Sequence, residues 1–129
     1  MKDKIDENPT LRFAKKYGMQ LHFISREEYR KKDEVEFINH LNTKYPNTYV
    51  IPEGGTNDFA IKGCEEILYD DCFEYDFIAS AIGTCGTIAG LIESSKPHQK
   101  VLGFPSLKGN FIQNEIEKLT NKTNFTIFN

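Results

Sequence analysis

Residues 77–91 read FIASAIGTCGTIAGL, an apolar run that passes into a loop of small residues and then into a second apolar stretch. Only Ser80 interrupts the run from Phe77 to Ile82, a pattern typical of a parallel strand that is covered on both faces. The glycines and threonines that follow end the strand, and the apolar residues after them return at helical spacing. This stretch therefore predicts a strand, a short loop and a helix.

The same alternation continues on both sides of this stretch. Further strands are predicted at residues 19–23, 48–51, 101–104 and 125–128. Helices are predicted at residues 9–17, 26–44, 60–68, 88–92 and 111–119. Ser25 and Glu28 form a capping box that opens the long helix at 26–44. Strands that alternate with helices imply an α/β fold, with a parallel sheet and helices on both faces in a three-layer, Rossmann-like arrangement.

The composition is that of a slightly acidic globular chain. Its 129 residues carry 16 basic and 19 acidic side chains, which give a net charge of −3 at pH 7 and a pI near 5.6. This charge argues against a nucleic acid or a membrane surface as a partner. No apolar run is long enough to span a membrane, and the first residues have no apolar stretch of the kind that a secretory signal needs.

The cysteines and histidines predict a cytoplasmic chain without a metal site. Cys64, Cys72 and Cys85 are odd in number and have no export signal before them, which favours free thiols in the cytoplasm. The histidines at positions 22, 40 and 98 are scattered, and the sequence contains no Cys-x-x-Cys pair. No metal ligand is therefore assigned.

The loop Gly83-Thr84-Cys85-Gly86-Thr87 is the first candidate for a binding site. It stands between a predicted strand and a predicted helix, and the first turn of a helix offers N–H groups and a dipole that favour an anion. The two glycines leave room for a phosphate near the backbone, and the two threonines add hydroxyl donors. The loop is not a Walker motif and does not match Gly-x-Gly-x-x-Gly in register. A tight turn with glycines for packing explains the same residues, so both interpretations stay open.

A second glycine loop, Glu53-Gly54-Gly55-Thr56-Asn57, also follows a predicted strand and precedes a helix. If the two strands are neighbours, both loops open at the same edge of the sheet, and two convergent loops favour a pocket. Glu53 is also explained as a solvated carboxylate, and Thr56 or Asn57 as a helix cap. These five residues are candidates for the pocket, with their roles left open.

Together the two loops resemble the 1-aminocyclopropane-1-carboxylate deaminase and D-cysteine desulfhydrase family. Residues 51–57 and the following Gly63-Cys64-Glu65-Glu66 are similar to the family's Pro-x-Gly-Gly-Ser/Thr loop and Gly-x-x-Glu helix. Residues 83–87 with Ala89-Gly90-Leu91 are similar to its Gly-Ser/Thr-small-Gly-Thr loop and helix. The resemblance covers most of the chain and implies part of the tryptophan-synthase-β-like fold of pyridoxal-phosphate enzymes. It also implies that Gly83, Thr84, Cys85, Gly86 and Thr87 hold the phosphate of pyridoxal 5′-phosphate.

The chain also departs from the family. Family members are longer, and the lysine that binds their coenzyme lies in a Ser-Gly-Asn-Lys-type segment without a counterpart here. Lys62 and Lys108 are expected to be surface lysines, so no catalytic residue is assigned. By analogy, residues 1–51 complete the small α/β domain of such an enzyme, and residues 52–129 form part of its large cofactor-binding domain.

The resemblance implies a fragment of a pyridoxal-phosphate-dependent deaminase or desulfhydrase that acts on a small amino acid, of the 1-aminocyclopropane-1-carboxylate or D-cysteine type. Without the lysine, the fragment is expected to be inactive alone, and whether it binds the coenzyme stays open. One alternative is a stand-alone α/β module that binds a phosphorylated small molecule without catalysis, and another is a remnant without a ligand. Because a fragment leaves sheet edges uncovered, we expect a homo-oligomer.

Overall fold

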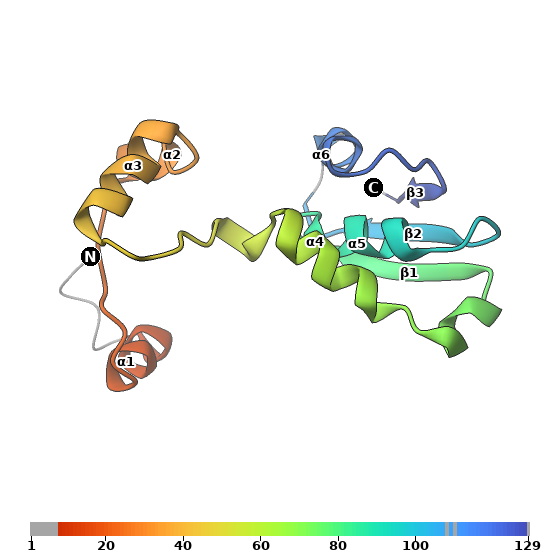
Figure 1. Ribbon diagram of the computed structural model, residues 1–129, viewed down its shortest axis with the longest axis horizontal. Helices are drawn as coiled ribbons and strands as arrows, with labels where there is room; N and C mark the ends of the chain where they lie inside the picture. The colour runs from red at the N-terminus through yellow and green to blue at the C-terminus, as the bar shows by residue number, and fades with distance from the viewer. Residues whose placement is uncertain (1–7, 108, 110, 129) are drawn as a thin grey trace. The chain divides into compact units, whose positions relative to one another are not determined.

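The computed structural model describes residues 8–107, 109 and 111–128 (Figure 1). Contacts within the chain divide it into two compact units, residues 1–50 and residues 51–129, which we call unit 1 and unit 2. This division lies next to the predicted boundary between residues 51 and 52. The assignment of the two parts to the domains of a larger enzyme stays a prediction. No helix within the described ranges has the length and apolar character needed to cross a membrane.

Unit 1 begins with helix α1, which spans Pro9–Lys16. The side chain of Asn8 starts the helix by accepting hydrogen bonds from the backbone N–H groups of Thr10 and Leu11, at 3.0 and 3.1 Å. Gly18 follows the helix with a φ of +82°, a conformation that glycine adopts without strain. Both the helix and its end agree with the prediction.

The long helix predicted after Ser25 is in fact two shorter helices. Ser25 and Glu28 do form the capping box, in which Ser25 N donates to Glu28 Oε2 at 2.7 Å and Glu28 N donates to Ser25 Oγ at 3.0 Å. The backbone and side-chain hydrogen bonds with Ser25 lower the pKa of the Glu28 carboxyl. Helix α2 spans only Arg26–Arg30, and a second helix, α3, spans Val35–Lys44. None of the described residues of unit 1 is buried, so tertiary packing does not hold a longer helix together.

The strands predicted at residues 19–23 and 48–51 are wrong. Neither segment pairs as a strand, and Met19, Tyr49 and Ile51 expose 64%, 65% and 71% of their surface. A strand is stabilised by its neighbours in a sheet and by the burial of at least one face. In the described residues, neither segment has a neighbouring strand, and neither contains a buried residue.

Unit 2 holds the sheet of the protein. Its elements are η2 (Glu53–Gly55), α4 (Asp58–Cys64), η3 (Glu65–Ile67), η4 (Asp70–Glu74), β1 (Phe77–Ile82), α5 (Gly86–Ser94), β2 (Lys100–Pro105), α6 (Phe111–Leu119) and β3 (Phe125–Ile127). The strands are parallel in the order β1-β2-β3, with Ile78 opposite Val101 and Val101 opposite Phe125. The predicted α/β fold with a parallel sheet is confirmed.

Helices α5 and α6 share one apolar core with the sheet. The core consists mainly of Ile82, Ile88, Leu91, Ile92, Val101, Ile112 and Ile116. Side chains alternate between the two faces of a strand. Ile78 and Ile82 of β1 therefore point to this core, on what we call the covered face. Phe77, Ala79 and Ala81 lie on the opposite face, which we call the open face, and are exposed.

The open face carries aromatic side chains that are exposed. Phe77 exposes 64% of its surface, and Phe104 stacks on Phe128 with ring centroids 5.1 Å apart. The prediction that strand 77–82 is covered on both faces is therefore wrong for the described residues, because β1 is an edge strand with one open face. The sheet remains consistent with a three-layer fold, in which a second layer of helices would pack on the open face.

Helices α4 and α5 approach each other closely at Gly90. A Cβ atom added there would lie 2.4 Å from Cys64 Cβ and 2.7 Å from the carbonyl oxygen of Ile61. Only glycine therefore fits at this crossing. Gly63, on α4, is different, since an added Cβ would have no heavy atom within 4 Å.

Candidate phosphate-binding site

The loop between β1 and α5 presents the start of a helix at the carboxyl edge of the sheet. Cys85 precedes the first turn of α5 with a φ of +68°, and no side chain caps this helix. The N–H groups of the first turn, starting with those of Gly86 and Thr87, therefore point to a place where an anion is favoured. Residues 81–88 line a cavity of about 40 Å³. Pockets for whole small molecules measure about 300–1,000 Å³, so this one suits a single small group.

The two glycine loops singled out from the sequence meet in the structure. The hydroxyl of Thr56 lies 2.9 Å from both the carbonyl oxygen and the hydroxyl oxygen of Thr84. The hydroxyl of Thr84 in turn donates to the carbonyl of Gly54 at 3.4 Å. A Cβ atom at Gly54 would lie 2.3 Å from Thr84 Cγ2, and one at Gly86 would lie 3.0 Å from Thr56 Oγ1. The loops thus form one contiguous structure that depends on two glycines.

The remaining candidates of the second loop have separate places. Asn57 caps α4, since its side chain accepts a hydrogen bond from Ala60 N at 2.8 Å. Gly55 has a φ of +71° with open space around it, and Glu53 is exposed. Of the two residues proposed as caps, Asn57 is therefore the cap, whereas Thr56 joins the loops.

Ser106 adds a third segment to this edge of the sheet, which the sequence analysis did not identify. Its backbone N–H and its hydroxyl both donate to the carbonyl of Ile82, at 3.0 and 3.1 Å. The residue follows β2, the strand next to β1, so its position directly after a predicted neighbouring strand was the available signal. Lys62 is exposed on α4, and Lys108 lies outside the described residues.

Cys85 is buried in this loop, and its surroundings make the thiol a poor nucleophile. Burial, with a smaller contribution from the charge of Glu115, raises the pKa of Cys85. A higher pKa leaves less thiolate at a given pH, and the thiolate is the reactive form. Cys64 and Cys72 are free thiols that are only partly buried. Within the described ranges, no group of three or more His, Cys, Asp or Glu side chains is placed to hold a metal ion.

We therefore expect two of the three cysteines to react quickly with a thiol reagent in the folded chain, and Cys85 to react at least about tenfold more slowly. The measurement is a time course with Ellman's reagent near pH 8, followed by peptide mapping of the modified residues. In denaturant all three thiols should react at similar rates. Rapid modification of Cys85 in the folded chain would contradict its buried position.

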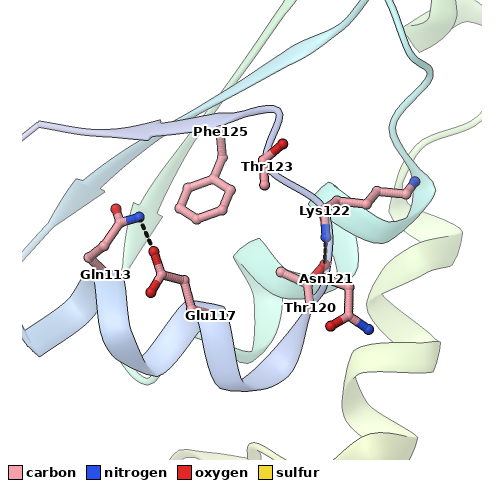
Figure 2. A pocket seen from close by; sticks show the side chains of 7 residues that line it. All are labelled: Gln113, Glu117, Thr120, Asn121, Lys122, Thr123 and Phe125. Atoms are coloured by element: carbon pink, nitrogen blue, oxygen red, sulfur yellow. Dashed lines mark hydrogen bonds between the residues drawn. The ribbon is translucent and has the colours of Figure 1, made fainter.

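A second cavity lies at the opposite, amino edge of the sheet (Figure 2). It measures about 310 Å³ and is lined by Gln113, Glu117, Thr120, Asn121, Lys122, Thr123 and Phe125. Gln113 Nε2 donates to Glu117 Oε1 at 2.6 Å on the α6 side. Lys122 Nζ donates to the carbonyls of Glu93 and Ser95, where α5 ends. The two bonds of Lys122 connect the loop before β3 to the end of α5. This cavity therefore lies at the opposite end of the strands from the two glycine loops.

Comparison with known proteins supports the family resemblance at a coarse level. The chain is similar to a protein from Thermotoga maritima that is provisionally named a 1-aminocyclopropane-1-carboxylate deaminase, with 33% identity over 81 residues. The match covers 57% of this chain and 26% of the relative, so it spans about a quarter of the relative's length. No family model and no solved structure matches the chain.

Proposed function

We propose that this chain is a fragment of a pyridoxal-phosphate-dependent deaminase or desulfhydrase, and that residues 83–87 bind the phosphate of the coenzyme. The observation that carries the proposal is the meeting of the two glycine loops, through Thr56 and Thr84, beside the uncapped start of α5. The similarity to the provisionally named 1-aminocyclopropane-1-carboxylate deaminase supports the family. The substrate of the whole enzyme would be a small amino acid, of the 1-aminocyclopropane-1-carboxylate or D-cysteine type.

The residues present fit the phosphate end of the coenzyme. Backbone N–H groups of Gly86 and Thr87, with the hydroxyl of Thr87, an exposed residue, would bind the phosphate oxygens. The hydroxyl of Thr84 instead holds the neighbouring loop in place. When bound, pyridoxal phosphate supplies an electron sink for a carbanion of the substrate. The role of this chain is to hold and orient the coenzyme.

We further propose that the chain does not turn over substrate by itself. A lysine that binds this coenzyme needs a desolvated pocket that favours its neutral form. Lys62 is exposed, and no lysine is among the residues 81–88 that line the 40 Å³ cavity. The same small cavity also favours the second candidate function, a stand-alone module for a phosphorylated small molecule. The backbone and hydroxyl groups that line this cavity suit a phosphate, and none of the lining residues is specific for a pyridine ring.

A titration with three ligands tests these proposals. Pyridoxal phosphate should bind at least about tenfold more tightly than pyridoxal, because pyridoxal lacks the phosphate that accepts the charge-assisted hydrogen bonds. Inorganic phosphate should compete with it. Absorbance and fluorescence of the coenzyme give the affinities. Thr87→Val should weaken binding, whereas Thr123→Val, at the other edge of the sheet, should leave it unchanged.

Each proposal has its own contradicting outcome. Equal affinities for pyridoxal phosphate and pyridoxal would refute the phosphate site. Phenyl phosphate that binds as tightly as the coenzyme would favour the stand-alone module. Borohydride reduction that labels one lysine in high yield would refute the proposed absence of a coenzyme-binding lysine.

A further inference from the structure

Two hydrogen bonds from one residue, Ser106, reach the carbonyl of Ile82. The backbone N–H of Ser106 donates at 3.0 Å, and its hydroxyl donates at 3.1 Å. A carbonyl oxygen has two lone pairs, so the two donors fill this acceptor. Ile82 is buried and is the last residue of β1, directly before the loop at residues 83–87. Ser106 therefore fixes the point at which this loop leaves the sheet.

The two bonds from Ser106 differ in what they contribute. The N–H bond continues the backbone pairing of β1 with β2, since Pro105 lies opposite Ile82 and Ser106 is the next residue of the chain. This bond alone gives the buried carbonyl a partner, so the hydroxyl is not needed to satisfy it. Sheet pairing therefore explains the N–H bond and leaves the hydroxyl bond unexplained.

The loop that follows Ile82 contains a residue whose conformation needs support. Cys85 has a φ of +68°, a left-handed conformation that is unfavourable for a residue with a Cβ atom. Such a conformation persists only where the surrounding structure holds it. Thr56 holds the loop on one side, through its hydrogen bonds to Thr84. The bonds from Ser106 hold it on the side of the strand, at Ile82.

We infer that Ser106 is a positioning residue for the phosphate site. Its hydroxyl holds the carbonyl of Ile82, and through it the loop at residues 83–87, in the conformation that presents the first N–H groups of α5 to a phosphate. Ser106 acts through Ile82 and needs no contact of its own with the coenzyme. The inference rests on the proposed function of the loop, but the conformation of the loop is measurable without a ligand.

Coenzyme titrations of three variants test this role. Ser106→Ala removes the hydroxyl and keeps the N–H bond, and it should lower the affinity for pyridoxal phosphate by about threefold to tenfold, the range expected for one hydrogen bond. Ser106→Thr keeps the hydroxyl and should restore the affinity to within about twofold of the unaltered chain. Ser80→Ala is the matched control, because Ser80 Oγ donates to the carbonyl of Ala81 in the same strand at 3.0 Å. It should also change the affinity less than about twofold.

Amide hydrogen exchange of the chain without a ligand measures the loop directly. The N–H of Ala89 donates to the carbonyl of Cys85 at 3.0 Å, so its protection reports whether that carbonyl stays in place. The N–H of Val101, a buried residue of β2, donates to the carbonyl of Asn124 at 2.9 Å and reports on the sheet. Ser106→Ala should speed the exchange of Ala89 at least about threefold and that of Val101 less than about twofold. A purely structural role would speed both amides equally, which would overturn the inference.

Failure of this inference is distinguishable from failure of the proposed function. If the unaltered chain does not bind pyridoxal phosphate, the proposed function is wrong, and the exchange of Ala89 alone decides the role of Ser106. Unchanged exchange of Ala89 in Ser106→Ala overturns the inference even if the affinity falls, because Ser106 would then contact the ligand itself. Equal losses of affinity in Ser106→Ala and Ser80→Ala, or a loss that Ser106→Thr does not reverse, overturn it as well.

Discussion

Gly90→Ala is expected to lower the free energy of unfolding by about 2–3 kcal/mol, which is a large fraction of the stability of a small domain. The new methyl group would lie 2.4 Å from Cys64 Cβ and 2.7 Å from the carbonyl oxygen of Ile61. Ile61 is itself buried, and its carbonyl belongs to the backbone of α4, so the contact is relieved only if α4 moves away from α5. The measurement is urea unfolding followed by circular dichroism.

Gly63→Ala is the matched control for this prediction. The residue lies in α4 beside Cys64, but a Cβ atom there meets no heavy atom within 4 Å. Alanine is favoured over glycine within a helix, so this variant should be stabilised by about 0.5–1 kcal/mol. If both variants change the free energy of unfolding in the same direction and by the same amount, the prediction is wrong, and the close approach of α4 and α5 does not exclude a side chain at position 90.

Gly54→Ala is expected to weaken the binding of pyridoxal phosphate by about tenfold or more. Its Cβ would lie 2.3 Å from Thr84 Cγ2 and 2.5 Å from Thr84 Oγ1. Thr84 must then move. It belongs to the loop at residues 83–87, which leads into α5 and which we propose as the phosphate site. A displaced loop presents its N–H groups at the wrong distance from the phosphate, and losing about 1.4 kcal/mol of binding free energy is a factor of ten in affinity.

Gly55→Ala separates this effect from backbone strain. Gly54 and Gly55 have nearly the same φ, +70° and +71°, so alanine pays a similar cost of about 1 kcal/mol at either position. Only at Gly54 does the methyl group meet another loop. Gly55→Ala should therefore bind the coenzyme within about twofold of the unaltered chain. Equal losses in the two variants would mean that the junction of the loops does not matter for binding.

The sequence predicted best where a pattern is local. The strand at 77–82 and the helices that follow the two glycine loops are confirmed, because apolar spacing and small residues act within a few positions of each other. The capping box of Ser25 and Glu28 is confirmed for the same reason. The meeting of the two loops was predicted only conditionally, and the structure supplies the bond from Thr56 to Thr84.

The predictions from sequence were wrong or incomplete where the structure of a segment depends on residues far from it in the sequence. Met19 to Phe23 alternate as a strand does, but alternation has no effect without a neighbouring strand, and the described residues offer none. The run at 77–82 predicted a strand covered on both faces, since its composition does not reveal whether another layer is present. Ser106 was missed because its role depends on the carbonyl of Ile82, which belongs to another strand.

The lack of buried side chains in residues 8–50 affects what a stability measurement on this chain reports. The dependence of unfolding free energy on denaturant, and the heat-capacity change of unfolding, both grow with the surface that becomes newly exposed. Residues 8–50 are exposed or only half-buried in the folded chain, so they add less to either quantity than their number suggests. A melting curve of the whole chain therefore reports mainly on residues 51–128, and substitutions within α1, α2 or α3 should shift it little.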